Sequence, residues 1–292
     1  MLPSALPRAP YLSLRGSTAL NRQASLFQAP GWNLRLAVLG SGSSGNSVII
    51  ESAGRRLLVD AGFACKQIEK RLETLGESAE KLDAMILTHE HRDHTRGVDV
   101  LSRRHDVPFY ATEGTLEGMK LSEKTAVRAK SIASGRPFEV AGFVVEPFSI
   151  PHDAREPVGF VIEDPAGTRI GLVADLGTRS QLAWGRLRDL DALIIETNHD
   201  LQMLRDGPYP WVLKQRVSGR HGHLSNKEAA DGLPELVSDR LEAVILYHLS
   251  RTNNEASIAA DVVGGRLEDE GCRARVLVTS QDQPTPWIEI GG

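Results

Sequence analysis

The chain has 292 residues, of which 41% are apolar and 25% charged, and this composition excludes disordered and collagen-like classes. Lys and Arg number 34 against 38 Asp and Glu, so the net charge of −4 excludes a surface that is basic overall and leaves only a local groove for nucleic acid. Two cysteines exclude a disulfide framework and predict a reducing, cytoplasmic location.

The first 33 residues differ in composition from the rest of the chain. Their only charged side chains are Arg8, Arg15 and Arg22, and Pro and Ser recur among them. This composition is typical of a transit-like segment, which would send the protein to an organelle, and equally of a disordered extension. We therefore expect the folded domain at residues 34–292.

Short apolar runs separated by Gly, Pro and Asp predict the elements of the first half. Strands are expected at these ranges: Leu34–Leu39, Ser47–Glu51, Arg56–Val59, Ala84–Leu87 and Phe109–Ala111. Helical spacing over Lys66–Leu75 predicts a helix that ends at Gly76, a residue type favoured just beyond helix ends.

In the second half, Phe138–Val173 predicts successive strands joined by Gly-containing turns. Ser225 and Glu228 form a capping box that begins a helix. A helix over Glu255–Glu268 is expected between strands at Val244–Leu246 and Arg275–Val278. This order predicts an α/β (α+β) chain with two sheets flanked by helices in a single domain. No run approaches the roughly 18 apolar residues of a membrane span, so no membrane partner is expected.

The strongest chemical signal is the cluster His89-x-His91-x-Asp93-His94, directly after a predicted strand. Imidazole and carboxylate groups suit several divalent metals, including zinc and manganese. Four ligands within six residues cannot easily close around one ion. The spacing therefore predicts two metal ions whose coordination is completed by distant residues.

Those distant residues are sought where a His or Asp follows a buried strand and precedes a turn. His152, Asp175 and His248 satisfy this rule. Each alone is compatible with a turn residue or a core histidine, but the upstream cluster favours metal binding for all three.

The order of these motifs resembles that of the metallo-β-lactamase superfamily, with Asp60 preceding the cluster. The resemblance implies a four-layer αββα sandwich with a dinuclear site at one edge of the sheets. It also implies the ligand sets: His89, His91 and His152 for one ion, Asp93, His94 and His248 for the other, and Asp175 as the bridge. Asp60 would support the histidine loop, as carboxylates commonly do for metal-bound imidazoles.

Finer motifs resemble the bacterial YycJ/WalJ group of exonucleases, which is related to ribonuclease Z. These motifs lie at residues 39–47, 151–154, 196–200, 222–226 and 248–254. The resemblance implies a metal-dependent 5′–3′ exodeoxyribonuclease in which His223 assists catalysis and His248 is a ligand. Members of this group do not usually carry a segment like the first 33 residues. That difference affects the expected cellular location and not the expected chemistry.

Two adjacent metal ions can convert a bridging water to hydroxide and bind a phosphodiester oxygen. We expect catalytic roles for Asp93, for His223 as the donor of a proton to the leaving oxygen, and for Glu196, which would orient His223. The alternative for His223 is a residue at a helix entry that satisfies backbone groups.

Substrate contacts are expected from two segments and from single residues near the motifs. The glycine-rich loop at 40–46 offers Ser43 and Asn46, although it could equally be a structural turn. The run from 214 to 223 is basic and predicts a narrow path for a nucleic-acid backbone, although a solvated turn is the default for so short a run. The remaining candidates for substrate binding are Arg216, Arg220, His199 and Arg251.

Two other functions stay open at this point. One is a ribonuclease Z-like hydrolase of RNA or small phosphodiesters, and the other is a thioester or lactone hydrolase of the same fold. The basic run beside His223 favours phosphodiesters, and the partner is expected to be DNA. The choice between zinc and manganese and the oligomeric state are not determined by the sequence.

Overall fold

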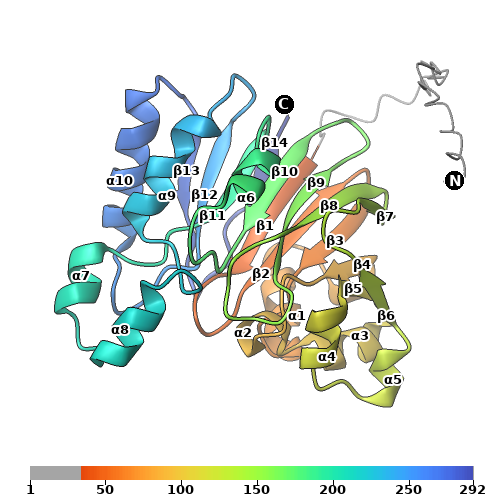
Figure 1. Cartoon of the computed structure of the whole chain (residues 1–292). Coiled ribbons are helices and arrows are strands. Elements are labelled where there is room, and N and C mark those ends of the chain that lie inside the picture. Colours follow the sequence, from red (N-terminus) through yellow and green to blue (C-terminus); the bar gives the residue numbers. More distant parts are fainter. Residues whose placement is uncertain (1–33, 292) are drawn as a thin grey trace, which may run out of the picture. The chain divides into compact units, whose positions relative to one another are not determined.

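A computed structural model describes residues 34–291 of the chain. The expected extension at residues 1–33 lies outside these residues. The described part forms one compact unit of two seven-stranded sheets with helices (Figure 1). Within it, no helix has the length and apolar character needed to cross a membrane.

The first sheet has the strand order β14-β1-β2-β3-β4-β5-β6. Its strands are β1 (Leu34–Gly40), β2 (Ser47–Ser52), β3 (Arg55–Val59), β4 (Ala84–Ile86), β5 (Phe109–Thr112), β6 (Ala129–Ile132) and β14 (Ile288–Ile290). Strands β3 to β6 run parallel to one another. β14 pairs antiparallel with β1, with Ile290 opposite Leu34, so the end of the chain completes this sheet.

The second sheet has the strand order β13-β12-β11-β10-β9-β8-β7. Its strands are β7 (Phe138–Val140), β8 (Phe143–Ser149), β9 (Val158–Glu163), β10 (Arg169–Val173), β11 (Ala192–Glu196), β12 (Ala243–Tyr247) and β13 (Arg275–Val278). Strands β7 to β10 form an antiparallel meander, and β10 to β13 are parallel. The carboxyl ends of β10, β11 and β12 therefore meet at one edge.

The helices connect and cover these strands. They are α1 (Cys65–Thr74), α2 (Arg92–Thr95), α3 (Val98–His105), α4 (Glu113–Gly118), α5 (Glu123–Ala126), α6 (Gln181–Arg186), α7 (Leu201–Asp206), α8 (Trp211–Val217), α9 (Asn226–Gly232) and α10 (Ala256–Asp269). Two short 3₁₀ turns lie at Ala79–Lys81 and Leu233–Glu235.

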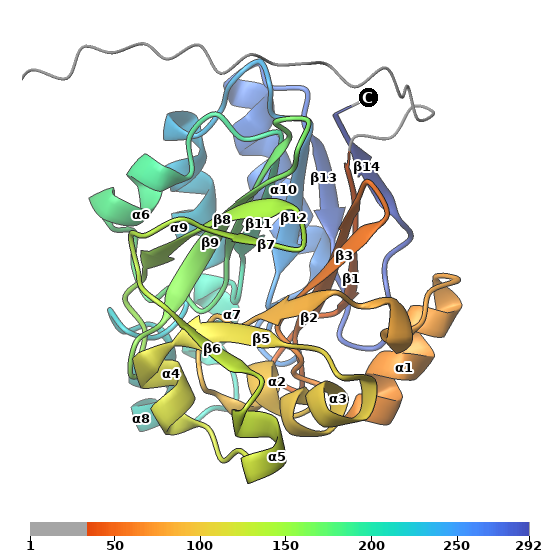
Figure 2. The same cartoon turned by 90° about the vertical axis from the view of Figure 1, so that its right-hand side faces the viewer.

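Successive side chains along the strands point to opposite faces of each sheet, and this alternation builds three apolar cores. In β1, Leu36 and Val38 belong to the core between the two sheets, whereas Ala37 and Leu39 belong to the core under α1 and α3. A third core joins the second sheet to α6, α9 and α10. Figure 2 shows these three helices on one side of the molecule and α1 and α3 on the other. The predicted αββα fold class is confirmed.

The predicted strands and long helices agree with the structure to within one or two residues at most ends. The sequence pattern predicted neither β6 nor β14, and it did not predict most of the short helices. The reason is clearest for α8, which has no buried residue and in which the apolar residues Trp211, Val212 and Leu213 are consecutive, so the segment lacks the apolar spacing of a helix that faces the core. β6 has only half-buried and exposed residues.

Candidate metal centre

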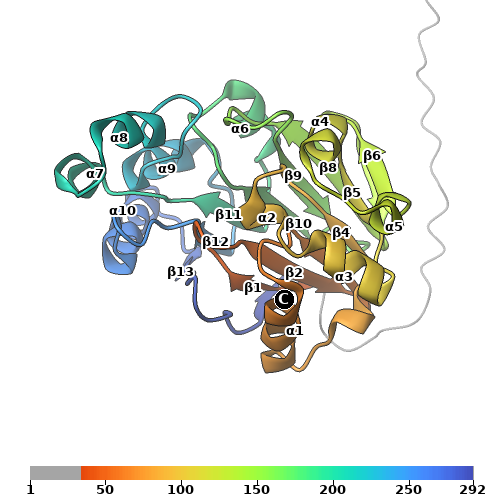
Figure 3. The same ribbon diagram turned by 90° about the horizontal axis from the view of Figure 1, so that it is seen from below.

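The candidate ligands and the two carboxylates that support them converge because they lie at or just after the carboxyl ends of strands in both sheets. Asp60 comes directly after β3, Asp175 two residues after β10, and His248 directly after β12. His89 lies three residues after β4, and Glu196 is the last residue of β11. Figure 3 views the molecule from this edge, where α2 lies near the ends of strands from both sheets.

The loop after β4 supplies four of the candidate ligands. His89 and His94 are fully buried, while the side chains of His91 and Asp93 are 32% and 24% exposed. His91 precedes α2, and Asp93 and His94 lie within it. The structure thus brings the whole predicted cluster together, with two residues buried and two reaching the surface.

Asp60 organises this loop from behind. Its Oδ1 accepts the Thr88 amide at 2.8 Å, and its Oδ2 accepts the Thr88 hydroxyl at 2.9 Å and lies 2.7 Å from His94 Nδ1. Because Nδ1 is held by Asp60, the other ring nitrogen of His94 faces Asp175, whose Oδ2 is 2.7 Å away. This is the arrangement of a carboxylate that orients a metal-binding imidazole.

Three groups of the predicted ligands have ligand atoms that all lie within 4.8 Å of one another, and a fourth group joins Asp175 and His248 to Glu196 and His223. The first three groups are His89 with His91 and His152, Asp93 with His94 and His248, and His89 with His94 and Asp175. Asp175 contacts the first group through His89 Nε2, at 3.8 Å, and the second through His94. The structure therefore brings the predicted ligands together, with Asp175 near both His89 and His94, and their division between two ions stays a prediction.

Buried atoms without partners indicate that the cluster suits a cation. Among the described residues, the Nε2 atoms of His89 and His248 are buried and form no hydrogen bond. Such atoms are costly to bury unless a ligand or ion satisfies them. The donor set of imidazoles and carboxylates is that of a divalent-metal site.

The electrostatics of the cluster agree with that assignment. Burial, together with the neighbouring His94, holds the pKa of His89 well below its usual value, which leaves an imidazole lone pair free to bind a metal. Burial alone would raise the pKa of Asp175, but His248 and His94 outweigh it and hold that pKa well below its usual range. Asp175 is therefore a carboxylate at neutral pH.

Glu196 contacts two backbone amides and two imidazoles in loops that flank the second sheet. Its Oε2 accepts the amides of Leu176 and Leu224 at 2.8 and 3.1 Å, and its Oε1 lies 2.8 Å from His223 Nδ1 and 2.9 Å from His248 Nδ1. The sequence predicted the contact with His223 but missed the one with His248. Both nitrogens lie 3.2 Å or less from Asp175 Oδ1 as well.

The contact with His223 also affects its protonation. Burial lowers the pKa of His223, but the carboxylates of Glu196 and Asp175 more than offset this and raise it well above its usual value. The side chain is 22% exposed. His223 is thus a partly exposed imidazole with one nitrogen fixed by a buried carboxylate.

Three residues of the centre adopt a left-handed backbone. Asp60, Asp175 and His248 have φ angles of 59°, 54° and 59°. Non-glycine residues seldom occupy this region, and such strain costs of the order of 1–3 kcal/mol and concentrates at functional sites. Asn, Asp and His enter this region more often than other non-glycine residues, and the recurrence of Asp or His one or two residues after buried strands is the sequence signal for this geometry.

Two of the predicted substrate-binding residues are buried. Asn46 has no exposed surface, and its amide bonds to Gly42 and lies 3.1 Å from His94 Nε2. His199 is also fully buried, and neither ring nitrogen has a hydrogen-bond partner. Substrate could reach neither side chain without displacing its neighbours, so their positions suit support of the loops around the centre.

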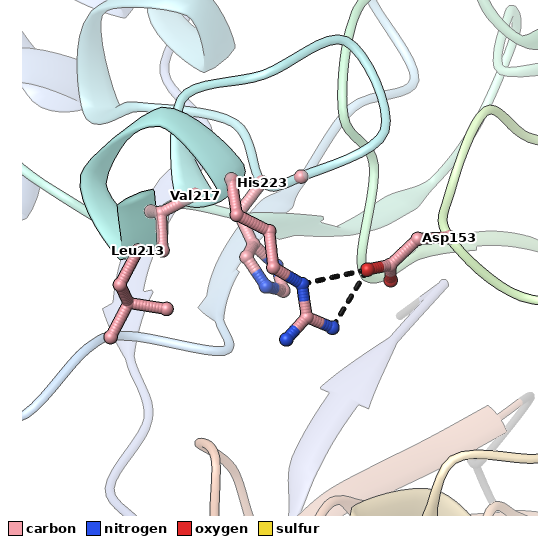
Figure 4. Close-up of a pocket in the computed structure, with 6 residues that line it drawn as sticks. Asp153, Leu213, Val217 and His223 are labelled. Carbon is pink, nitrogen blue, oxygen red and sulfur yellow. Dashed lines mark hydrogen bonds and ion pairs between the residues drawn. The ribbon is translucent and has the colours of Figure 1, made fainter. Parts of the chain in front are cut away.

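The other four predicted substrate-binding residues, Ser43, Arg216, Arg220 and Arg251, are exposed. Arg216 forms an ion pair with Asp153 at 2.7 Å, and Arg251 forms one with Asp282. Figure 4 shows the first of these pairs beside His223, in a cavity of about 100 Å³ that is also lined by Leu213, Val217 and Gly222. The positive charge of the predicted basic path at residues 214–223 is therefore partly neutralised by an aspartate.

Comparisons with known proteins agree with this geometry. The model of the beta-lactamase superfamily domain matches residues 55–248, a range that includes Asp60 and His248. The chain is 36% identical over 266 residues to exodeoxyribonuclease WalJ of Streptococcus pneumoniae strain D39, which covers 88% of this chain and 98% of that protein.

Two further matches are informative. Exodeoxyribonuclease YycJ of Bacillus anthracis is 34% identical over 240 residues, or 82% of this chain and 90% of the relative. The crystal structure of YhfI from Bacillus subtilis, a metallo-beta-lactamase fold protein, aligns with a TM-score of 0.66 at 19% identity, covering 86% of this chain and 98% of YhfI. The second of these matches supports the fold alone.

Proposed function

The chain belongs to the beta-lactamase superfamily, and on that premise we propose that it is a metal-dependent 5′–3′ exonuclease that hydrolyses the phosphodiester bonds of DNA. The relatives named exodeoxyribonuclease, which match over most of both chains, support this proposal. The catalytic domain is proposed to span residues 34–292. Cys65 and Cys272, which are not bonded to each other, support a cytoplasmic location.

The observation that carries the proposal is the contact between His223 and Glu196 at the border of the metal centre. A metal site alone would serve many hydrolases of this fold. The added imidazole, held through Nδ1 at 2.8 Å, leaves Nε2 as the nitrogen that can face substrate. A leaving alkoxide needs a proton donor of this kind, and such help is typically worth about 10²- to 10⁴-fold.

The proposed cofactor is a pair of divalent ions, zinc or manganese. When bound, such ions activate a water and polarise the phosphodiester. His89, His91 and His152 would hold one ion, Asp93, His94 and His248 the other, and Asp175 both. Asp93 is 24% exposed and would also contact the attacking water, which gives it a catalytic role.

The remaining side chains position these groups. Asp60 fixes His94, and Glu196 fixes His223 and His248, so that three imidazoles present the correct nitrogen before substrate arrives. Ser43, Arg216, Arg220 and Arg251 are exposed and are proposed to contact the nucleic-acid backbone. We do not include Asn46 and His199 in this set because both are buried.

The test is a substrate panel with the metal-loaded protein. The panel contains single-stranded DNA, double-stranded DNA and RNA, each with a label at the 5′ end, together with a thioester and a lactone. We expect cleavage of DNA with early release of the 5′ label. Preferential cleavage of RNA would favour a ribonuclease Z-like activity, and thioester turnover without cleavage of nucleic acid would overturn the proposal.

A further inference from the structure

A second cavity opens beside Asp93, and three of its five lining residues, Ser44, Arg92 and Arg96, have no role in the proposed function. It has a volume of about 270 Å³ and is lined by Ser43, Ser44, Arg92, Asp93 and Arg96. The two arginines come from α2 and its end, and the two serines come from the glycine-rich loop between β1 and β2. The cavity therefore adjoins the metal centre through Asp93.

The serine side of the cavity is held in a fixed shape. The Ser44 amide donates to Gln281 Oε1 at 2.7 Å, and the Gln281 amide donates to the Gly45 carbonyl at 2.7 Å. Gly42 has a φ of 142°, and a Cβ there would lie 2.8 Å from Gln281 Oε1, so a side chain would disturb this contact. Among the described residues, the hydroxyls of Ser43 and Ser44 form no hydrogen bond and are exposed.

The arginine side carries unneutralised positive charge. Arg92 and Arg96 are four residues apart, so they lie side by side on one face of the short helix. Both are exposed, and neither forms an ion pair within residues 34–291. Arg216 and Arg251, by contrast, are each paired with an aspartate.

These features suit an anion with several oxygens. An arginine presents a planar set of donors that matches phosphate, and hydroxyl donors add directional contacts. The acid in the cavity is Asp93, whose charge would be offset by the metal ion that it is proposed to hold. An incoming phosphate would therefore meet two guanidinium groups and two hydroxyls.

We propose that Ser43, Ser44, Arg92 and Arg96 form a phosphate subsite that holds a phosphate group of the substrate strand adjacent to the one being cleaved. This inference rests on the proposed nuclease function. The bound group is either the terminal 5′-phosphate or an internal phosphodiester, which share the same charged oxygens. The subsite would place the strand so that the next phosphate reaches the metal centre.

The test compares Arg92→Ala, Arg96→Ala and the double variant with wild type as metal-loaded enzymes. Arg103→Ala is the matched control, because Arg103 lies on α3 and pairs with Asp99. The substrates are one single-stranded DNA oligonucleotide with a 5′-phosphate, the same oligonucleotide with a 5′-hydroxyl, and bis(p-nitrophenyl) phosphate. The last has a single phosphate and cannot reach the subsite while bound for cleavage, so its turnover reports folding and metal loading.

For the double variant we expect KM for DNA to rise about tenfold or more, with turnover of bis(p-nitrophenyl) phosphate within twofold of wild type. The slope of log KM against log salt should fall by about 0.7, since the subsite holds one phosphate and each phosphate contact on a single strand contributes about 0.7. A rise confined to the 5′-phosphorylated strand assigns the subsite to the terminal phosphate, and a rise on both strands assigns it to an internal one.

Two negative results are separable. Unchanged KM and salt slope in the double variant, with DNA cleaved by wild type, would overturn the subsite and leave the nuclease function intact. Absence of DNA cleavage by wild type that still turns over bis(p-nitrophenyl) phosphate would overturn the nuclease function itself.

Discussion

The two sheets build their halves of the metal centre in different ways. The first sheet supplies four candidate ligands within six consecutive residues, and Asp60 holds them through Thr88 and His94. The second sheet supplies Asp175, His223 and His248 from loops far apart in the chain, and Glu196 contacts all three segments. One half is thus encoded locally, and the other is assembled by the fold.

Each half depends on one fully or almost fully buried carboxylate, but the two carboxylates serve different numbers of groups. Within residues 34–291, the side chain of Asp60 forms hydrogen bonds only with Thr88 and His94, which both lie in the segment after β4. Glu196 contacts two backbone amides and two imidazoles on three loops. In the assembled half, one residue, Glu196, holds three loops together. Substitution of Glu196 should therefore reduce activity more than substitution of Asp60.

The largest loss is expected where the two halves meet. Asp175→Asn keeps the size of the side chain and a residue type that tolerates the left-handed backbone, but it removes the charge shared by both ligand sets. We expect kcat/KM to fall by about 10³-fold or more, because metal-based stabilisation of several kcal/mol is lost. Steady-state cleavage of labelled DNA would measure this, and a loss below tenfold would contradict a shared role.

Glu196→Gln should have the next largest effect. The substitution removes the carboxylate that orients both His223 and His248, so we expect kcat to fall by about 10²- to 10³-fold. His223→Gln is the matched variant, because it removes only the proton donor and should cost about 10²-fold. If Glu196→Gln lost no more activity than His223→Gln, the contact between Glu196 and His248 would not contribute to activity.

Asp60→Asn should have a smaller effect than Glu196→Gln. The amide can still accept from Thr88, and we expect a loss of about 10- to 100-fold in metal affinity or activity. Titration of the apo protein with zinc, followed by an activity assay at saturating metal, separates the two quantities. Equal losses for both carboxylates would remove the contrast between the halves.

Asp99 lies outside both halves of the metal centre, so its substitution should change the stability of the protein and not its activity. Burial opposes the shift, but hydrogen bonds from Ser122 and Thr125 and the neighbouring Arg103 lower the pKa of Asp99 to about 2. The folded-state pKa lies below the unfolded value, so the stabilisation is complete above about pH 4 and is lost as pH falls through 2.

Asp99→Asn should therefore destabilise the protein at pH 7 by about 1 kcal/mol and flatten the loss of stability between pH 4 and 2. Its DNA cleavage at pH 7 should match that of wild type. Urea unfolding across this pH range would measure the first effect, and a variant as acid-sensitive as wild type would show that the hydrogen bonds contribute nothing.

The sequence predicts the locally encoded half of the centre better than the half that the fold assembles. The spacing of His89 to His94 is visible in the chain itself, and His152, Asp175 and His248 follow from a rule about strand ends. The contact between Glu196 and His248 was not predicted, because it depends on the register of β11 beside β12, where Glu196 is opposite Tyr247. The cavity between Arg92 and Ser43 likewise exists only after the first sheet has formed.

The burial of Asn46 and His199 has a similar origin. Both lie in motifs that surround the site, and in sequence they look like residues that face substrate. The structure directs Asn46 toward His94 and packs His199 beside Ser225, through a backbone bridge between the loops. The side on which a loop residue faces is decided by tertiary packing rather than by its motif.

The most direct test of the central claim, that the two halves form one centre for two metal ions, is metal stoichiometry by native mass spectrometry. We predict two ions per chain in wild type and one in each of His152→Ala and His248→Ala, with DNA cleavage lost in both variants. A single ion in wild type, or two ions in either variant, would contradict the account.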